Sequence, residues 1–484
     1  MTAATVPASS EPLPRDLVKL ALALMLGAIM VALDMTVVNV ALQTLVNDLH
    51  TSVATIQWVS TAYLLALATV IPVSGWAVER YGARTMWTVS IVLFITGSVL
   101  SGLAWSAGSL IVFRVLQGLG GGMIIPLIQT ILAHAAGPDR VGRVMGVVGV
   151  PAMLGPVLGP VLGGVIVSDA SWRLIFLINV PICVAALVAA RRVAMPDTKR
   201  AAAVRLDVAG LALVSPALIA IVYGLSSAAT YGSFTDPHAL VPFGLGLALL
   251  LGYALHALRM RGEPIIDLRL FRDRRFASYS AIVFFFSMAM LGTALLLPLY
   301  YQQVRGEDAL HAGLLLAPQG LGMAIALIAV SRLADRIDPR AVILSGLALT
   351  AGALLVYTGV AADTNIVLLS AAAFVSGAGI GAALVPAMAG AYAGLPREAV
   401  SRATSSIRVF QQLGGSFGIA ILAVILERQT TAQGSAHAGL ATAYGNTFWW
   451  ALAFTALALV PTLLLPKMRR RAATPSLEPS PANT

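Results

Sequence analysis

Long apolar runs separated by short polar connections dominate this chain. An α-helix rises about 1.5 Å per residue, so about 20 apolar residues cross the roughly 30 Å hydrocarbon layer of a membrane with their backbone amides satisfied internally. Runs of this length predict an all-α polytopic membrane protein with fourteen transmembrane helices. The predicted helices cover residues 17–41, 53–74, 86–104, 107–133, 141–167, 174–193, 206–229, 238–260, 276–299, 312–332, 341–361, 365–391, 402–427 and 446–468.

Basic residues are distributed asymmetrically around these helices. Short cytoplasmic loops of membrane proteins retain Lys and Arg, whereas external loops are depleted of them. With both termini in the cytoplasm, 26 of the 31 basic residues fall on that side. We therefore predict a multi-pass protein of the inner (cytoplasmic) membrane. The exceptions are Arg114, Arg173, Arg305, Arg408 and Arg428.

Composition excludes several other classes of protein. At 58% hydrophobic and 11% charged residues, the chain cannot cover a soluble core with a polar surface. The net charge of +10 is read as an orientation signal and as attraction to anionic lipid, with no nucleic-acid partner. Cys183 is the single cysteine, so the chain has no internal disulfide. The sequence holds no nucleophile motif, phosphate loop or metal-ligand cluster, which argues against an enzyme and against a metal or cofactor.

The first six and the last six predicted helices share a pattern of motifs. The loop after the second helix carries Glu79-Arg80 and Arg84, and the loop after the tenth carries Asp335-Arg336 and Arg340, 256 residues later. Three alternating glycines of the fourth helix recur in the twelfth at an offset of 259 residues. These glycines are Gly118, Gly120 and Gly122, followed by Gly377, Gly379 and Gly381.

This repeat predicts two six-helix bundles around a central site, with two helices inserted between them. The expected organisation is a cytoplasmic N-terminal tail at 1–16, a first bundle at 17–195, two linker helices at 206–260, a second bundle at 276–470 and a disordered cytoplasmic tail at 471–484.

Five segments, in order, resemble motifs of the major facilitator superfamily, specifically of its fourteen-helix drug/proton antiporter branch (EmrB/QacA type). The segments are 33–42, 75–84, 114–118, 155–164 and 172–181. Glu79 departs from the usual Asp of the second motif, and Ala83 departs from a usual basic residue. The resemblance implies the major facilitator fold and a proton-coupled multidrug or antibiotic efflux antiporter, which exports lipophilic small molecules by alternating access.

Asp34 and Arg114 are the predicted proton-coupling pair. Asp34 lies deep in an apolar helix, where an uncompensated charge costs roughly 2.5 to 3.5 kcal/mol. Arg114 lies at a similar predicted depth, about 10 Å below the external boundary. In this hypothesis Arg114 holds Asp34 deprotonated, and protonation of Asp34 releases the pair. The alternatives are an acid that snorkels outward or bonds to its own helix backbone, and an arginine that only ties its helix to backbone carbonyls.

Two further sets of residues are assigned conformational roles. Charges at cytoplasmic helix ends can latch the bundles in one state, and prolines and glycines in the fifth helix can form a hinge. Ordinary membrane anchoring and helix packing are the alternatives. The predicted latch comprises Gly75, Glu79, Arg80, Gly82, Arg84, Asp335, Arg336 and Arg340. The predicted hinge comprises Gly155, Pro156, Gly159, Pro160, Gly163 and Gly164.

Polar and aromatic side chains within the helices predict a substrate cavity. Snorkelling of the arginine and lipid contact of the aromatic rings are the alternatives. Because buried acids are scarce, we expect neutral, zwitterionic or singly cationic cargo rather than dications. The candidate lining residues are Asn39, Trp58, Tyr63, Gln117, Arg408, Gln411 and Gln412.

The expected partners are a lipophilic drug or antibiotic, protons and membrane lipid. A proton-coupled symporter or a facilitator of a small metabolite can use the same fold, although the Gly-Pro motif of the fifth helix favours antiport. A membrane enzyme or receptor is the alternative from another class. The need for a periplasmic adaptor, the oligomeric state and the proton stoichiometry are left open.

Overall fold

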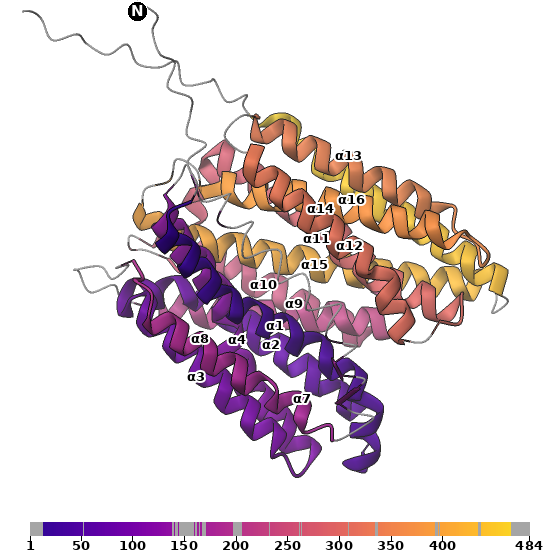
Figure 1. Ribbon diagram of the computed structural model, residues 1–484, viewed down its shortest axis with the longest axis horizontal. Helices are drawn as coiled ribbons and strands as arrows, with labels where there is room; N and C mark the ends of the chain where they lie inside the picture. The colour runs from indigo at the N-terminus through magenta and orange to yellow at the C-terminus, as the bar shows by residue number, and fades with distance from the viewer. Residues whose placement is uncertain are drawn as a thin grey trace, which may run out of the picture.

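A computed structural model provides the structure of the chain. It describes residues 13–51, 53–137, 140, 144, 159, 162–163, 165–166, 171–196, 206–231, 233–260, 262, 264–307, 309–333, 337–392, 395, 397–433 and 437–465. Within these ranges the regular elements are α-helices and one short 3-10 helix, arranged as two groups of long, roughly aligned helices (Figure 1).

The helices follow the predicted order along the chain. The N-terminal part contains α1 (Arg15–Asp48), α2 (Val53–Tyr81), α3 (Ala83–Gly102), α4 (Ala107–Ala136), α7 (Leu174–Leu177) and α8 (Asn179–Arg191). The middle part contains α9 (Val208–Tyr231), α10 (Pro237–Arg259) and the 3-10 helix η1 (Leu268–Arg272). The C-terminal part contains α11 (Arg274–Gln303), α12 (Ala309–Leu333), α13 (Pro339–Thr358), α14 (Ile366–Tyr392), α15 (Arg397–Gln433) and α16 (His437–Leu464).

Thirteen helical spans in the described residues are long and apolar enough to cross a membrane. Each coincides with one of the predicted spans, which confirms an all-helical, multi-pass membrane protein. The other predicted helix, 141–167, lies outside the described residues except for a few positions. Several helices are longer than their apolar runs, because polar turns extend them: α1 continues to Asp48 and α15 begins at Arg397.

The predicted helix at 174–193 is divided into α7 and α8 by a turn at Ile178. Pro181 has no backbone N–H, so the carbonyl of Leu177, four residues earlier, lacks its usual helical donor. The break comes directly before Asn179, the first residue of α8.

Glycines allow α4 to pack closely against two neighbouring helices. A Cβ atom on Gly118 would lie 2.6 Å from the backbone oxygen of Tyr63, and one on Gly122 would lie 2.6 Å from that of Leu67, both in α2. The intervening Gly120 faces α3 instead: a Cβ atom on Gly120 would lie 2.6 Å from the backbone nitrogen of Phe94. Side chains at these positions would separate the helices.

The second half repeats this arrangement in α14. Gly377 and Gly381 face the backbone of α12, and the intervening Gly379 faces that of α13. The glycines that match in the sequence therefore match in their packing as well.

The two halves meet through a small set of helices. In addition to its neighbours in the C-terminal half, α15 packs against α2, α4 and the inserted α9. Figure 1 shows the indigo-to-magenta helices of the N-terminal half and the orange-to-yellow helices of the C-terminal half converging at one end and diverging at the other.

Candidate functional site

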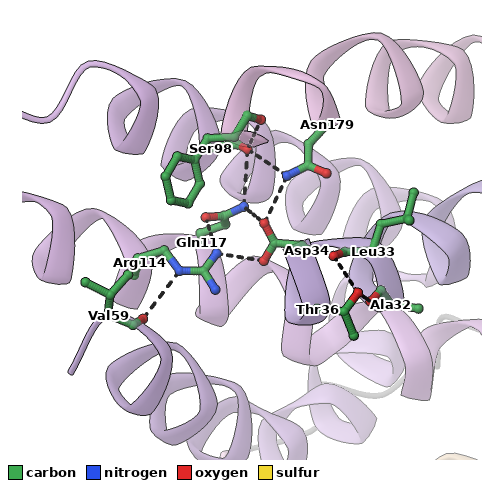
Figure 2. Close-up of polar contacts among 10 residues, drawn as sticks. Ala32, Leu33, Asp34, Thr36, Val59, Ser98, Arg114, Gln117 and Asn179 are labelled. Carbon is green, nitrogen blue, oxygen red and sulfur yellow. Dashed lines mark hydrogen bonds and ion pairs between the residues drawn. The ribbon is translucent and has the colours of Figure 1, made fainter. Parts of the chain in front are cut away.

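A charged pair is fully buried among the helices of the N-terminal half. Arg114 Nη1 lies 2.7 Å from Asp34 Oδ2, and each side chain is only 1% exposed. The pair joins α1 to α4 (Figure 2). The structure thus brings together the two residues that the sequence singled out for proton coupling.

Neutral side chains surround the carboxylate of Asp34. Gln117 Nε2 and Asn179 Nδ2 donate to Asp34 Oδ1 at 2.8 and 2.9 Å. Both amides also donate to the Ser98 hydroxyl, at 3.2 and 3.1 Å, and that hydroxyl donates to the carbonyl of Phe176 at 2.7 Å. Four helices therefore place donors or acceptors around one carboxylate (Figure 2).

The guanidinium of Arg114 is held from several directions. Nη1 also donates to Gln117 Oε1 at 2.7 Å, and Nε donates to the carbonyl of Val59 at 3.4 Å. The guanidinium carbon lies 4.0 Å from the ring centre of Tyr63, a cation–π contact. Arg114 therefore contacts a carboxylate as well as a backbone carbonyl, so the alternative of carbonyl binding alone does not describe it.

Local sequence explains how these side chains converge. α4 begins with a capping box in which Ser106 and Ser109 bond reciprocally, which fixes the start of the helix. Arg114 and Gln117 are three residues apart and so share one helix face. The break before Asn179 places that amide at the start of α8, opposite Asp34.

The hydrogen bonds of Asp34 depend on its negative charge. The printed hydrogen bonds to the Asp34 oxygens come from three N–H groups, one of them on a cation, so a proton on Asp34 would remove the negative charge that strengthens these bonds. Asn179 Oδ1 is buried and has no hydrogen-bond partner within the described residues. Rotation of this amide would present Oδ1 as an acceptor to a protonated Asp34.

The residues predicted to line a cavity lie in three places. Tyr63 and Gln117 belong to the Asp34 cluster, whereas Trp58 is 40% exposed and stacks on Tyr223 of α9 with ring centres 5.9 Å apart. The side chain of Asn39 lies outside the described residues.

The remaining three predicted cavity residues lie on α15. Arg408 Nε donates to Gln129 Oε1 of α4 at 2.8 Å, and its Nη1 donates to Gln411 Oε1 at 2.6 Å. Gln412, next to Gln411, is partly buried. This group therefore lies where the two halves meet, apart from Asp34.

The predicted latch residues are bound to different partners. Glu79 Oε1 lies 3.8 Å from Arg402 Nε of α15, and Arg402 Nη1 lies 3.8 Å from Asp267 Oδ2. This ion pair joins the two halves. Sequence reasoning had assigned a role to neither Arg402 nor Asp267.

Other latch residues contact their own half. Arg84 Nη2 donates to the carbonyl of Val193 at 3.0 Å, and Arg340 Nη1 donates to that of Leu465 at 3.2 Å. Gly75 is buried in α2, Arg80 is exposed, and Gly82 has a φ of 85°, a conformation that suits glycine, at the start of α3. Asp335 and Arg336 lie outside the described residues.

Most of the predicted hinge lies outside the described residues, namely Gly155, Pro156, Pro160 and Gly164. Gly159 and Gly163 are described, helical and buried. A Cβ atom on Gly159 would collide with the Thr36 side chain of α1, two residues from Asp34. Gly159 therefore lies close against α1 beside the charged pair.

Asn179 and Ser98 are site residues that sequence reasoning had not assigned. Asn179 lies within the segment 172–181 that resembles a family motif, which is the signal that could have indicated it. Ser98 has no such signal, because serine is common in membrane helices.

Known proteins resemble this chain in sequence and in fold. Residues 24–419 and 312–482 match the family model described as Major Facilitator Superfamily. The "Multidrug resistance protein B homolog" of Mycobacterium tuberculosis is 39% identical over 406 residues, which cover 84% of this chain and 75% of that protein. The "Tetracenomycin C resistance and export protein" of Streptomyces glaucescens is 30% identical over 410 residues, which cover 84% and 75%.

Solved structures show the same fold at low sequence identity. The human organic anion transporter MFSD10 (TETRAN) has a TM-score of 0.62 at 17% identity, covering 93% of this chain and 99% of that one. The proton:xylose symporter XylE also has a TM-score of 0.62, at 13% identity, covering 90% of this chain and 94% of that one. This family and fold are those of transporters rather than enzymes. The chain therefore belongs to the Major Facilitator Superfamily and, within it, to the drug-efflux branch.

Proposed function

We propose that this efflux transporter is a proton-driven antiporter of the inner membrane, which exports lipophilic drugs or antibiotics by alternating access. The observation that carries the proposal is the buried Asp34–Arg114 pair, whose carboxylate also accepts hydrogen bonds from the amides of Gln117 and Asn179. A buried carboxylate is expensive in a membrane, and proton relays are a frequent reason for retaining one.

The contacts between the halves support a cycle of two states. Ser74 Oγ lies 3.2 Å from Ser405 Oγ. This contact, Glu79–Arg402 and Gln129–Arg408 all join the C-terminal parts of α2 or α4 to the N-terminal part of α15, and these helix ends are predicted to be cytoplasmic. We therefore infer a state that is closed on the cytoplasmic side. Asp34 lies farther along α1, toward the opposite end.

In the proposed cycle, external protons reach Asp34 while the cytoplasmic side is closed. Protonation removes the negative charge that Arg114 contacts, which biases the protein toward closure on the outside. Release of the proton to the cytoplasm restores the pair and allows cargo to bind. The proton gradient therefore changes the populations of two states, and each state exposes the cargo to one side.

Transport by purified protein in proteoliposomes tests this proposal. Asp34→Asn keeps the shape of the side chain but cannot ionise, so we expect gradient-driven transport to fall to the level of protein-free liposomes. The panel should include lincomycin, tetracenomycin C and lipophilic dyes, because relatives carry the first two in their names. Asp16→Asn is the matched control, since Asp16 is on the same helix with a side chain 90% exposed. Undiminished gradient-driven transport by Asp34→Asn would exclude the proposal.

A symporter is the second candidate, because the fold of XylE is shared. The direction of substrate-induced proton movement separates the two. An antiporter moves protons opposite to the substrate, and a symporter moves both in one direction.

A further inference from the structure

Arg408 is a partly buried cation that neutral groups hold at the interface between the halves. It lies six residues, or about 9 Å, inside the apolar span that begins at Arg402. Its guanidinium is directed across the interface between the halves, to Gln129 at 2.8 Å, and along its own helix to Gln411 at 2.6 Å. It therefore does not snorkel toward the end of α15.

Arg408 lacks the counter-ion that comparable arginines have. Arg114 pairs with Asp34, and Arg402 lies between two carboxylates. Among the residues that the structure describes, no carboxylate lies within ion-pair distance of Arg408. Its Nη2 atom forms no hydrogen bond to any of these residues. Two glutamine oxygens satisfy two of its five N–H groups but leave its charge uncompensated.

An uncompensated charge at this depth is costly and needs a function. The Arg408–Gln129 contact joins the two halves, so it must break when the halves move apart on this side. Cargo that passes between the halves therefore meets a guanidinium with free donors.

We propose that Arg408 binds an anionic group of the exported molecule, either a carboxylate or an ionised acidic phenol or enol, attached to a lipophilic aromatic body. This inference rests on the proposed export function and specifies its substrate class. A guanidinium can bind a carboxylate through two parallel hydrogen bonds, and Gln129 and Gln411 orient it without neutralising it. Anionic cargo differs from the neutral, zwitterionic or cationic cargo that the scarcity of buried acids had led us to expect.

Binding of three naphthalene derivatives to the purified full-length protein tests this site. 1-Naphthoate, 1-naphthamide and 1-naphthylmethylammonium share a ring system and differ in charge. We expect the protein to bind naphthoate at least tenfold more tightly than naphthamide, and the ammonium least tightly.

Two variants remove this preference by different routes. Arg408→Gln removes the cation, and Gln411→Glu retains Arg408 but supplies an internal carboxylate of nearly the same size. Each should make naphthoate bind no better than naphthamide. Arg428→Gln, which removes an exposed cation from the same helix, should leave the preference intact. If Arg408→Gln does not fold, the Gln411→Glu result decides.

Equal binding of naphthoate and naphthamide by the unmodified protein, or a naphthoate preference that survives both variants, would overturn the inference. Gradient-driven export of naphthamide that depends on Asp34 measures the proposed function separately. If the protein exports naphthamide but shows no preference for the anion, the Arg408 site is wrong and the proposed function stands. If the protein prefers the anion but shows no gradient-driven export, the proposed function is wrong and the anion site stands.

Discussion

At the scale of single residues, the energetic cost of charge identifies part of the site. Asp34 and Arg114 could be selected from the sequence because charged side chains are rarely retained in apolar helices without a role. Their partners Asn179 and Ser98 could not be selected from the sequence, because a neutral polar residue costs less free energy in a membrane helix than a charged one. Their proximity to Asp34 also depends on how the helices pack. Trp58 illustrates the same limit, since its contact with α9 is tertiary.

Asn179→Ala tests the role of the amide that contacts Asp34. The change removes one hydrogen bond to a charged group, worth about 1.5 to 3 kcal/mol, and also the group that could accept from protonated Asp34. We expect proton-driven export to fall about tenfold or more, measured as the initial rate in proteoliposomes.

Asn446→Ala is the matched control for this change. Asn446 donates to Gln429 at 3.3 Å in the other half of the protein, far along the chain from the charged pair. Its loss should leave the export rate nearly unchanged. Equal export by the Asn179 variant and the unmodified protein would show that the amide has no part in coupling.

At the scale of helices, apolar runs predicted which segments cross the membrane but not their ends. α1 and α15 extend beyond their apolar runs because polar turns continue a helix once it has left the hydrocarbon layer. The break at Ile178 could have been predicted from Pro181. The sequence does not predict which helix each glycine of α4 and α14 faces, because this depends on how three helices pack together.

Gly118→Ala tests the close packing of α4 on α2. The new methyl group would lie 2.6 Å from the Tyr63 carbonyl oxygen, so the two helices must separate. We expect a loss of about 1 to 3 kcal/mol in stability, seen as a lower midpoint of thermal unfolding in detergent.

Gly352→Ala is the control, because its new methyl group meets no atom within 4 Å. Alanine also has the higher helix propensity, so this variant should be as stable as the unmodified protein or slightly more so. A Gly118 variant that unfolds at an unchanged temperature would contradict the packing described for α4.

At the scale of the whole molecule, the internal repeat indicated two related halves, and the structure shows where they meet. The latch predicted from loop charges includes Glu79, and among the described residues Glu79 forms an ion pair with Arg402 of α15, which the loop charges did not indicate. Single motifs could not indicate this pairing, because it joins residues more than 300 positions apart in the chain. Alternating access requires that such contacts break in each cycle.

A disulfide between Ser74→Cys and Ser405→Cys tests whether this closure must open. The two hydroxyl oxygens are 3.2 Å apart, within reach of a disulfide between cysteines at these positions. In a Cys183→Ser background, oxidation should stop export and a reductant should restore it. Each single cysteine should export normally under both conditions, and full-rate export by the cross-linked protein would rule out this movement.

Proton release on binding of cargo tests the central claim most directly, because it observes Asp34 exchanging its proton without a full transport cycle. Purified protein in weakly buffered detergent, measured over a series of pH values with a pH-sensitive dye, should release protons when an exported compound is added. Asp34→Asn should bind the compound but release none, and Asp16→Asn should behave like the unmodified protein. Equal proton release by Asp34→Asn and the unmodified protein would contradict the account.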